Sequence, residues 1–183
     1  MFFALGRRRA TACGRRWLHA PALKLSSPEA MEAFGAGLAP HVPCPSTVFL
    51  VGDLGCGKTC FARGFVRAWT DDADMHVTSP TYLLLNTYDD AAMARSLYHM
   101  DLYRLDSVSP VDAKALGLED AFASSVNLIE WPDRLTPDLV PGDRLEVHIA
   151  YTDTEDERAV QLKAFGSTWE SALRWFESTQ VQR

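Results

Sequence analysis

The chain has 183 residues, of which 47% are hydrophobic and 23% are charged, and its formal net charge is −6. This length and composition suit one globular domain with a substantial core, and they exclude a fibrous or an intrinsically disordered protein. No apolar run approaches the roughly 20 residues that cross a bilayer, so we do not expect a membrane protein.

The beginning of the chain is basic, unlike the rest. Residues 1–28 contain six Arg or Lys side chains and no Asp or Glu, whereas the remaining residues carry 12 basic and 24 acidic side chains. An Arg-rich segment without acidic residues is typical of an organellar transit peptide. We therefore predict that residues 1–25 are a transit peptide or a disordered basic extension, and that residues 26–183 form a single domain. The predicted location is the mitochondrial or another organelle matrix, and the alternative is a cytoplasmic protein with a basic start.

The predicted domain begins with a helix. Ser27 offers an N-cap, Pro28 suits the first turn, and Glu29 is placed for a capping box. Apolar side chains recur at helical spacing over residues 31–38, which predicts one face that packs against a sheet. We expect this helix to end near residue 40, before a connector that contains two prolines.

A phosphate-binding loop follows. Residues 52–59 read G-D-L-G-C-G-K-T and match the pattern G-x-x-x-x-G-K-[ST]. An apolar run at residues 47–51 predicts a strand before the loop, and residues 60–69 predict a helix after it, which is the context the motif requires. Glycines let backbone N–H groups turn toward phosphate oxygens, Lys58 adds a positive charge, and the Thr59 hydroxyl can bind Mg²⁺. A glycine-rich turn that matches by chance is the alternative.

The loop also contains one of the four cysteines of the chain. The cysteines form no C-x-x-C pair and have no His at zinc-ligand spacing, which favours free thiols in a reducing compartment. A helix N-terminus can lower the pKa of a thiol such as that of Cys56, but the favoured interpretation is that Cys56 fills a position for a small residue. The residues expected to contact the nucleotide are Gly52, Asp53, Leu54, Gly55, Cys56, Gly57, Lys58, Thr59 and Cys60.

Two later strands are predicted to end in a carboxylate. Residues 96–101 end at Asp101, and residues 126–130 end at Glu130. In phosphate-loop enzymes, Mg²⁺ is held by the Ser or Thr of the loop and by an acidic residue at the end of a neighbouring strand. Both acids are therefore candidates for the Mg²⁺ site, and a solvated strand end is the alternative for either. A Ser-Pro-Thr stretch at residues 79–81 predicts a plain turn or a loop that reaches the nucleotide.

The remainder of the chain predicts the outer elements. Residues 106–123 suit one or two short helices over the sheet, and residues 132–143 suit a loop. Residues 145–149 and 160–164 alternate apolar and polar side chains, which predicts an antiparallel hairpin. A capping box at residues 167–170 precedes a terminal helix. Together these elements predict an α/β, three-layer, P-loop NTPase-like fold with a mostly parallel central sheet and an antiparallel C-terminal hairpin.

Four blocks occur in an informative order. They are G-D-L-G-C-G-K-T at residues 52–59, S-P-T-Y at 79–82, H-M-D-L-Y-R-L at 99–105 and I-E-W-P-D-R-L at 129–135. Their order and spacing resemble the TsaE family, formerly called YjeE, which is the ATPase component of tRNA threonylcarbamoyladenosine biosynthesis in bacteria and organelles. The similarity runs from about residue 26 to about residue 165 and leaves out the basic start and the tail.

The resemblance implies a small ATPase that binds ATP and Mg²⁺. Its implied partners are a TsaD-like threonylcarbamoyl transferase and, where one exists, a TsaB-like subunit. In that family ATP hydrolysis supports transfer of a threonylcarbamoyl group to adenosine 37 of tRNAs that read ANN codons, and the ATPase is not itself the transferase. We expect contact with tRNA only through the complex, because the domain is strongly acidic and phosphate contacts need Lys and Arg. We expect no binding to DNA or to a membrane.

The resemblance also implies roles for individual residues. Matched by position, Thr59 and Glu130 would be Mg²⁺ ligands, and residues 55–59 would form the phosphate cradle. Thr81 would lie in a switch-like loop that senses the γ-phosphate, and Asp101 would orient the attacking water or the water shell of the metal. The catalytic residues implied in this way are Lys58, Thr81 and Asp101.

Other matched positions are peripheral. Trp131 would lie beside the site, and Ser27 and Glu29 correspond to a helix start near the base of the nucleotide. Cys56 departs from the family, which usually has Ala at this position.

Two rival functions remain at this point. A small-molecule kinase would share the loop but need an arginine-rich lid, and the sequence shows none. A GTPase-type switch would need an N-K-x-D pattern, whereas residues 86–89 read N-T-Y-D and lack the Lys. Arg104 and Arg134 are the nearest candidates for an arginine finger, and neither is obvious. We therefore expect slow ATP hydrolysis by the chain alone and faster hydrolysis in a complex.

Overall fold

The computed structural model describes residues 22–90 and 94–181. The strands are β1 (Leu23–Leu25), β2 (Ser46–Val51), β3 (Leu85–Asp90), β4 (Arg95–Asp101), β5 (Val126–Glu130), β6 (Arg144–Tyr151) and β7 (Arg158–Phe165). The helices are α1 (Pro28–Leu38), α2 (Lys58–Thr70), α3 (Pro110–Ala115), α4 (Leu118–Ser124) and α5 (Glu170–Val181). Short 3-10 helices are η1 (Ala39–His41), η2 (Pro132–Arg134) and η3 (Pro137–Leu139). Most of the predicted basic extension, residues 1–21, lies outside the described residues.

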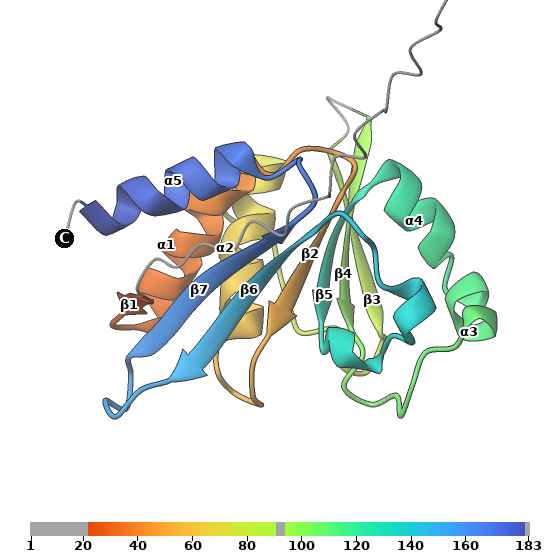
Figure 1. The fold of residues 1–183 in the computed structure, drawn as a ribbon, viewed down its shortest axis with the longest axis horizontal. Coiled ribbons are helices and arrows are strands. Elements are labelled where there is room, and N and C mark those ends of the chain that lie inside the picture. The colour runs from red at the N-terminus through yellow and green to blue at the C-terminus, as the bar shows by residue number, and fades with distance from the viewer. Residues whose placement is uncertain (1–21, 91–93, 182–183) are drawn as a thin grey trace, which may run out of the picture.

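The seven strands form one mixed sheet in the order β1-β7-β6-β2-β5-β4-β3. The central strands β6, β2, β5 and β4 are parallel to one another, whereas β3 on one side and β7 and β1 on the other pair antiparallel. Helices α1, α2 and α5 lie on one face of the sheet and α3 and α4 on the other (Figure 1). The predicted α/β class, the three layers and the antiparallel C-terminal hairpin are confirmed.

The first strand is a feature that the sequence analysis missed. Leu23 and Leu25 are buried, and β1 pairs with β7 so that Leu23 lies opposite Val160. Residues 23–25 therefore belong to the sheet of the domain, although the predicted boundary placed them in the basic extension. Three alternating residues are too few to show a period of two, and the Arg-rich composition of the preceding segment concealed them.

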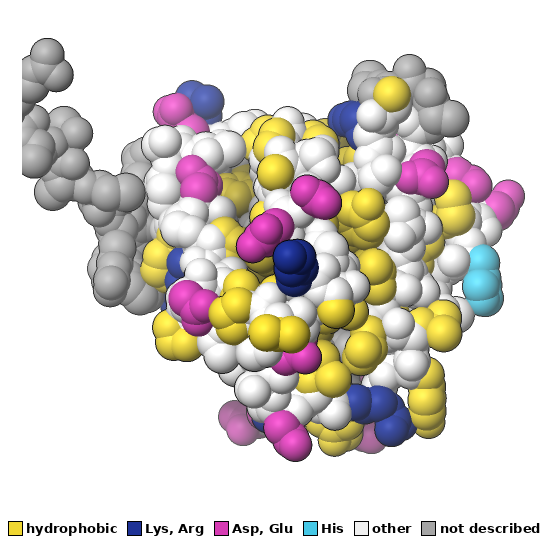
Figure 2. All heavy atoms as spheres, turned by 90° about the vertical axis from the view of Figure 1, so that its right-hand side faces the viewer, with side chains coloured by type: hydrophobic (Ala, Val, Ile, Leu, Met, Phe, Trp, Pro, Cys, Tyr) yellow, Lys and Arg dark blue, Asp and Glu magenta, His cyan; other side chains and the backbone are white. Residues whose placement is uncertain are grey.

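Helices α3 and α4 cover one face of the sheet, as predicted for residues 106–123. Ser109 caps α3 through a complete capping box with Asp112. Beneath the two helices, alternate strand residues such as Phe49, Met100 and Ile129 form a buried cluster. Figure 2 looks onto this side of the molecule, where hydrophobic side chains lie between scattered acidic ones.

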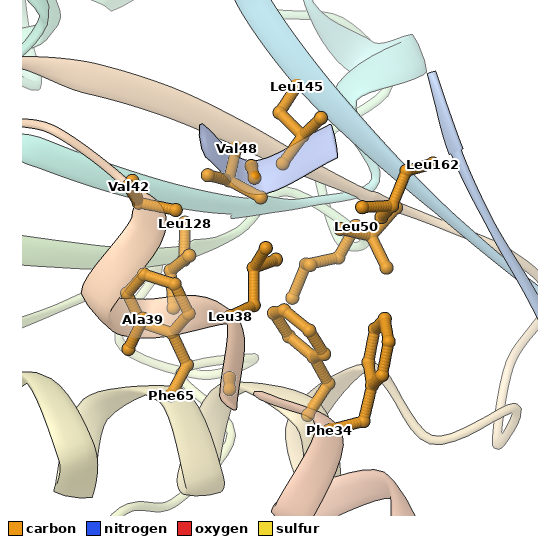
Figure 3. Packing of buried hydrophobic residues seen from close by; sticks show 14 of the residues in the cluster. Phe34, Leu38, Ala39, Val42, Val48, Leu50, Phe65, Leu128, Leu145 and Leu162 are labelled. Carbon is orange, nitrogen blue, oxygen red and sulfur yellow. The ribbon is translucent and has the colours of Figure 1, made fainter. Parts of the chain in front are cut away.

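The larger core lies on the opposite face, beneath α1 and α2. The side chains of Phe34, Leu38 and Phe65 from these helices meet residues of four strands (Figure 3). The strand residues shown there are Val48, Leu50, Leu128, Leu145 and Leu162.

Helix α1 starts at the predicted N-cap, because the Ser27 side chain accepts a hydrogen bond from the Ala30 N–H at 3.2 Å. The predicted capping box with Glu29 is wrong, because the third residue of the helix, which would complete such a box, is Ala30. Within the two described ranges, no helix combines the length and apolar character needed to cross a membrane.

The parallel centre of the sheet determines where polar residues meet. Because β2, β4 and β5 run in the same direction, their carboxyl ends lie at one edge of the sheet. The phosphate loop leaves the end of β2, and Asp101 and Glu130 are register partners at the ends of β4 and β5. Residues far apart in the sequence thus come together at this edge.

Candidate functional site

The loop between β2 and α2 has the geometry of an anion cradle. A side chain at Gly52 would lie 2.2 Å from the Ile149 carbonyl oxygen and 2.7 Å from Cys56 Sγ, so only glycine fits there. Gly57 has φ +110°, a conformation that other residues rarely adopt, and it immediately precedes α2. The N-terminus of α2 therefore opens directly onto the loop, where backbone N–H groups favour an anion.

The Lys58 side chain folds back onto the loop and binds two of its carbonyl groups. This side chain is buried, and its ammonium group donates hydrogen bonds to the carbonyl oxygens of Gly52 at 2.9 Å and Asp53 at 2.8 Å. The same Nζ lies 4.3 Å from the centre of the Trp131 ring, which places Trp131 beside the site. The positively charged Lys58 ammonium group is thus held at the loop by two carbonyl oxygen atoms and the face of the Trp131 ring.

The loop threonine contacts the acid at the end of β5. The Thr59 hydroxyl donates a hydrogen bond to Glu130 Oε1 at 3.1 Å. Glu130 is only 2% exposed although it is ionisable, so its surroundings must satisfy it. The predicted pair of metal ligands is therefore adjacent in the structure.

A histidine that the sequence analysis did not select also contacts this acid. His99 is fully buried in β4, and its Nε2 lies 2.9 Å from Glu130 Oε1. The sequence does indicate that His99 lies on the same face of the strand as Asp101, because it stands two residues before it and alternate residues of a strand share a face. Nothing in the sequence shows that β4 and β5 are neighbours.

The carboxylate of Asp101 is the centre of a second group of hydrogen bonds. Its Oδ2 accepts from Ser79 Oγ at 3.1 Å and from Thr81 Oγ1 at 2.5 Å, while Oδ1 accepts from the Tyr103 backbone N–H at 2.9 Å. The loop that carries Ser79 and Thr81 is therefore attached to the end of β4. Ser79 is an additional residue of the site; the sequence analysis placed it in a plain turn or a loop that reaches the nucleotide and gave it no role of its own.

One cavity of about 260 Å³ connects these groups. Its lining includes Lys58 and Thr59 of the loop together with Thr81, Asp101 and Glu130. The other lining residues are Leu54, Gly55, Gly57, Cys60, Ser79, Tyr103 and Trp131. Gly52, Asp53 and Cys56 do not line this cavity; the first two instead supply the carbonyls that hold Lys58.

A smaller hollow of about 80 Å³ continues from the loop toward α1. It is lined by Ser27, Pro28 and Met31 at the start of α1, by residues of the loop, and by Asp156 and Arg158 beside the β6–β7 turn. Ser27, which the resemblance implies lies near the base, lines this hollow, whereas Glu29 is not part of the lining.

The β6–β7 hairpin holds the tip of the loop. The Tyr151 hydroxyl at the end of β6 donates to the Leu54 carbonyl oxygen at 2.8 Å, and the guanidinium of Arg158 lies 4.4 Å from the centre of the Tyr151 ring. This contact was not predicted, because Tyr151 and Leu54 are distant in the sequence.

Cys56 is a packing residue of the loop. It is fully buried, and burial raises the pKa of its thiol, an effect that the nearby Lys58 opposes only in part. The loop therefore does not activate this thiol by lowering its pKa, in agreement with the favoured interpretation that a small residue belongs there.

The donor set suits a hard divalent cation. The described residues contain no group of three or more His, Cys, Asp and Glu side chains that would form a protein-only metal cage. The site instead offers the Thr59 hydroxyl beside the Glu130 carboxylate, and Asp101, the register partner of Glu130, lines the same cavity. Mg²⁺ prefers such oxygen donors, takes only one or two from the protein and keeps water or phosphate as the others.

The two arginines considered from the sequence do not enter the cavity. The Arg104 guanidinium stacks on the ring of the exposed Tyr82 at 4.2 Å, and Arg134 lies 3.8 Å from the Asp133 carboxylate. Among the residues that line the cavity in the described part of the chain, Lys58 is the only cation.

Comparisons with known proteins agree with this geometry. The family model described as "Threonylcarbamoyl adenosine biosynthesis protein TsaE" matches residues 25–160. A TsaE protein of Rickettsia bellii is 38% identical over 127 residues, covering 69% of this chain and 81% of the relative. One from Bacillus subtilis is 32% identical over 145 residues, covering 79% and 85%. The crystal structure of Bacillus subtilis YdiB superposes with a TM-score of 0.68 at 27% identity, covering 86% of this chain and 94% of that one.

Proposed function

Because this chain belongs to the TsaE family of tRNA threonylcarbamoyladenosine biosynthesis proteins, we propose that it binds ATP together with Mg²⁺ and hydrolyses it. The observation that carries the proposal is the single cavity in which Lys58, the Thr59–Glu130 pair and Asp101 meet. These are the charged and polar groups that phosphoryl transfer to water requires.

The loop binds the phosphates. Its backbone N–H groups and the N-terminus of α2 surround the anion, and the Lys58 ammonium, already held by two loop carbonyls, neutralises negative charge. Little rearrangement of the loop is needed, because the lysine and the glycines are in place before the ligand arrives. Such preorganisation is the main source of electrostatic stabilisation in enzymes.

Thr59 and Glu130 would hold Mg²⁺. When bound, the ion neutralises the charge that develops on the β- and γ-phosphate oxygens. The Thr59 hydroxyl and the Glu130 carboxylate supply hard oxygen donors on the side of the cavity formed by α2 and β5.

Asp101 orients the water that attacks the γ-phosphate. Its buried carboxylate faces the cavity and is held by three hydrogen bonds, from Ser79, Thr81 and the Tyr103 N–H. A carboxylate fixed in this way can accept a hydrogen bond from water in a defined direction. Thr81 senses the γ-phosphate, because its hydroxyl lines the same cavity and is attached to Asp101.

The base occupies the smaller hollow beside α1. This hollow shares Gly55, Gly57 and Cys60 with the phosphate cavity, so one nucleotide can reach both. Ser27 and Asp156 supply polar groups there, and Met31 supplies an apolar surface for a ring.

Hydrolysis by the chain alone is slow. An arginine that stabilises the transition state accelerates phosphoryl transfer strongly, and no described residue lining the cavity is an arginine. We therefore propose that a TsaD-like transferase, with a TsaB-like subunit where one exists, stimulates the reaction. Contact with tRNA occurs through this complex, because residues 29–183 carry 24 acidic and only 12 basic side chains, and phosphate contacts need Lys and Arg.

The rival functions find less support. The Asn86 side chain donates to the Thr78 carbonyl oxygen at 3.1 Å, and Asp89 accepts from Ser96 at 2.7 Å, so the N-T-Y-D stretch serves the fold rather than a guanine base. A small-molecule kinase would place arginines over the phosphates, and the described lining of the cavity contains none.

A nucleotide panel with and without Mg²⁺ tests this proposal. We expect ATP and ADP to bind more tightly than GTP and GDP, and Mg²⁺ to strengthen binding. ATP hydrolysis should rise when the proteins recovered by affinity purification of the chain are added back, and mass spectrometry should identify a TsaD-like transferase among them. Tight GTP binding with weak ATP binding, or full-speed hydrolysis without partners, would contradict the proposal.

The location in an organelle is also a proposal. It rests on the basic, acid-free composition of residues 1–28. A fusion of these residues to a fluorescent reporter should enter mitochondria or another organelle, and a diffuse cytosolic signal would favour the cytoplasmic alternative.

A further inference from the structure

His99 occupies an unusual place for a polar side chain. It is fully buried on β4, the strand next to the edge strand β3, and is paired in register with Leu128 of β5 and Asn86 of β3. Strand periodicity places His99 on the same face as Asp101, next to the row of residues that lines the cavity. An apolar side chain would satisfy the packing of such a position without a polar cost.

The ring has one polar contact among the described residues. His99 Nε2 lies 2.9 Å from Glu130 Oε1, and both side chains are almost completely excluded from solvent. A carboxylate accepts hydrogen bonds and does not donate them, so this contact requires the ring proton on Nε2. In the described part of the chain, Nδ1 has no hydrogen-bond partner. An unpaired, buried nitrogen is costly, and a histidine at this position has one. The hydrogen bond from Nε2–H to Glu130 therefore points to a role of His99 beyond packing.

We infer that His99 is a positioning residue: its Nε2–H fixes the Glu130 carboxylate beside Thr59 and so sets the affinity of the nucleotide site for Mg²⁺. This inference rests on the proposed function, in which Thr59 and Glu130 hold the ion. His99 does not line the cavity and acts only through Glu130.

The two donors to Glu130 are not equivalent. Both the Thr59 hydroxyl and His99 bond to Oε1. Thr59 is itself a proposed ligand, so its hydroxyl has a second function in the loaded site, whereas His99 faces the carboxylate from the interior of the sheet and has no such function. Side chains that hydrogen-bond to a metal ligand typically change metal affinity about 10- to 100-fold when they are replaced.

The test compares His99→Met, which removes the donor, with His99→Gln, whose amide can donate from a similar reach. ADP affinity is measured by calorimetry in excess Mg²⁺ and in EDTA, and Mn²⁺ binding to the ADP complex is measured by electron paramagnetic resonance. We expect His99→Met to reduce the strengthening of ADP binding by Mg²⁺ about 10- to 100-fold, with the affinity in EDTA within about twofold of wild type. His99→Gln should keep most of the strengthening, and Glu130→Gln, as the reference variant, should lose it.

The outcomes separate this inference from the proposed function. If wild type shows no strengthening by Mg²⁺, or Glu130→Gln matches wild type, the proposed metal site is wrong and the inference falls with it. Suppose that wild type and Glu130→Gln behave as expected. The inference alone is then overturned if Mg²⁺ still strengthens ADP binding to His99→Met, or if His99→Gln loses this strengthening to the same extent as His99→Met. An equal loss of ADP affinity in Mg²⁺ and in EDTA would show a structural role and would also overturn it.

A measurement on the wild-type side chain keeps the inference testable should His99→Met fail to fold. Nitrogen-15 correlation spectra of the imidazole report which nitrogen carries the proton. We expect an Nε2–H tautomer whose resonances move in the Glu130→Gln variant. An Nδ1–H tautomer, or resonances that Glu130→Gln leaves unchanged, would contradict the inference.

Discussion

Thr59 and Glu130, 71 residues apart in the sequence, are joined by a hydrogen bond of 3.1 Å from the threonine hydroxyl to Oε1. The bond exists because β2 and β5 are parallel neighbours, so the helix that follows one strand starts beside the end of the other. The N-terminus of α2 and a buried acid are thereby placed side by side, where we propose that the cation binds.

Replacing this acid tests the metal site. Glu130→Gln keeps the shape of the side chain but removes its charge, so we expect Mg²⁺ to strengthen nucleotide binding at least roughly tenfold less than in wild type. Binding in EDTA should be retained, because the phosphate cradle is intact. Titration calorimetry with ADP measures both. Glu119→Gln, on the exposed surface of α4, is the matched control and should behave like wild type.

Lys58→Ala should abolish ATP turnover. The change removes the positive charge of the loop and the two bonds that draw the carbonyls of Gly52 and Asp53 together. A hydrogen bond to a charged group contributes about 1.5–3 kcal/mol, so nucleotide affinity should also fall by at least roughly a factor of ten. Phosphate release and fluorescent-nucleotide binding measure the two effects. Lys114→Ala, on the exposed side of α3, should change neither, and wild-type turnover by Lys58→Ala would refute the assignment of the loop.

Asp101→Asn should separate binding from turnover. The amide is nearly isosteric with the carboxylate, so ATP binding should remain within about threefold of wild type. Turnover should fall about 100-fold or more, because a neutral amide orients and activates water poorly. Single-turnover hydrolysis by the reconstituted complex, compared with equilibrium binding, provides the measurement. Equal losses in both quantities would mean that Asp101 supports the loop of Ser79 and Thr81 and does not act on water.

The sequence allowed the phosphate loop and the strand-end acids to be predicted, because each is a local pattern of residue types. The α/β class followed from the order of strand and helix patterns. By contrast, the contact of His99 with Glu130 depends on the register of β4 and β5, and the short strand β1 depends on β7 for its pairing. Such contacts arise from the order of strands in the sheet, which no local pattern contains.

Tyr151→Phe tests the attachment of the loop tip to the hairpin. The change removes the hydroxyl that donates to the Leu54 carbonyl oxygen but retains the ring on which Arg158 stacks. Such a bond contributes about 0.5–1.5 kcal/mol, so nucleotide affinity should fall about two- to tenfold. The melting temperature without nucleotide should fall by no more than a few degrees, because the bond is exposed and contributes at most about 1.5 kcal/mol. Tyr88→Phe, which removes a hydroxyl in β3, should leave nucleotide affinity as in wild type.

Gly64→Ala tests the close packing of α1 on α2 beneath the site. A Cβ at Gly64 would lie 1.9 Å from the Glu32 carbonyl oxygen, so the two helices would have to separate. Overpacking of this kind costs about 1–3 kcal/mol, which outweighs the gain in helix propensity of up to about 1 kcal/mol. The melting temperature should therefore fall by several degrees, as measured by calorimetry. Gly142→Ala is the matched control, because a Cβ there has no atom within 4 Å, and an equal effect of both changes would refute the packing argument.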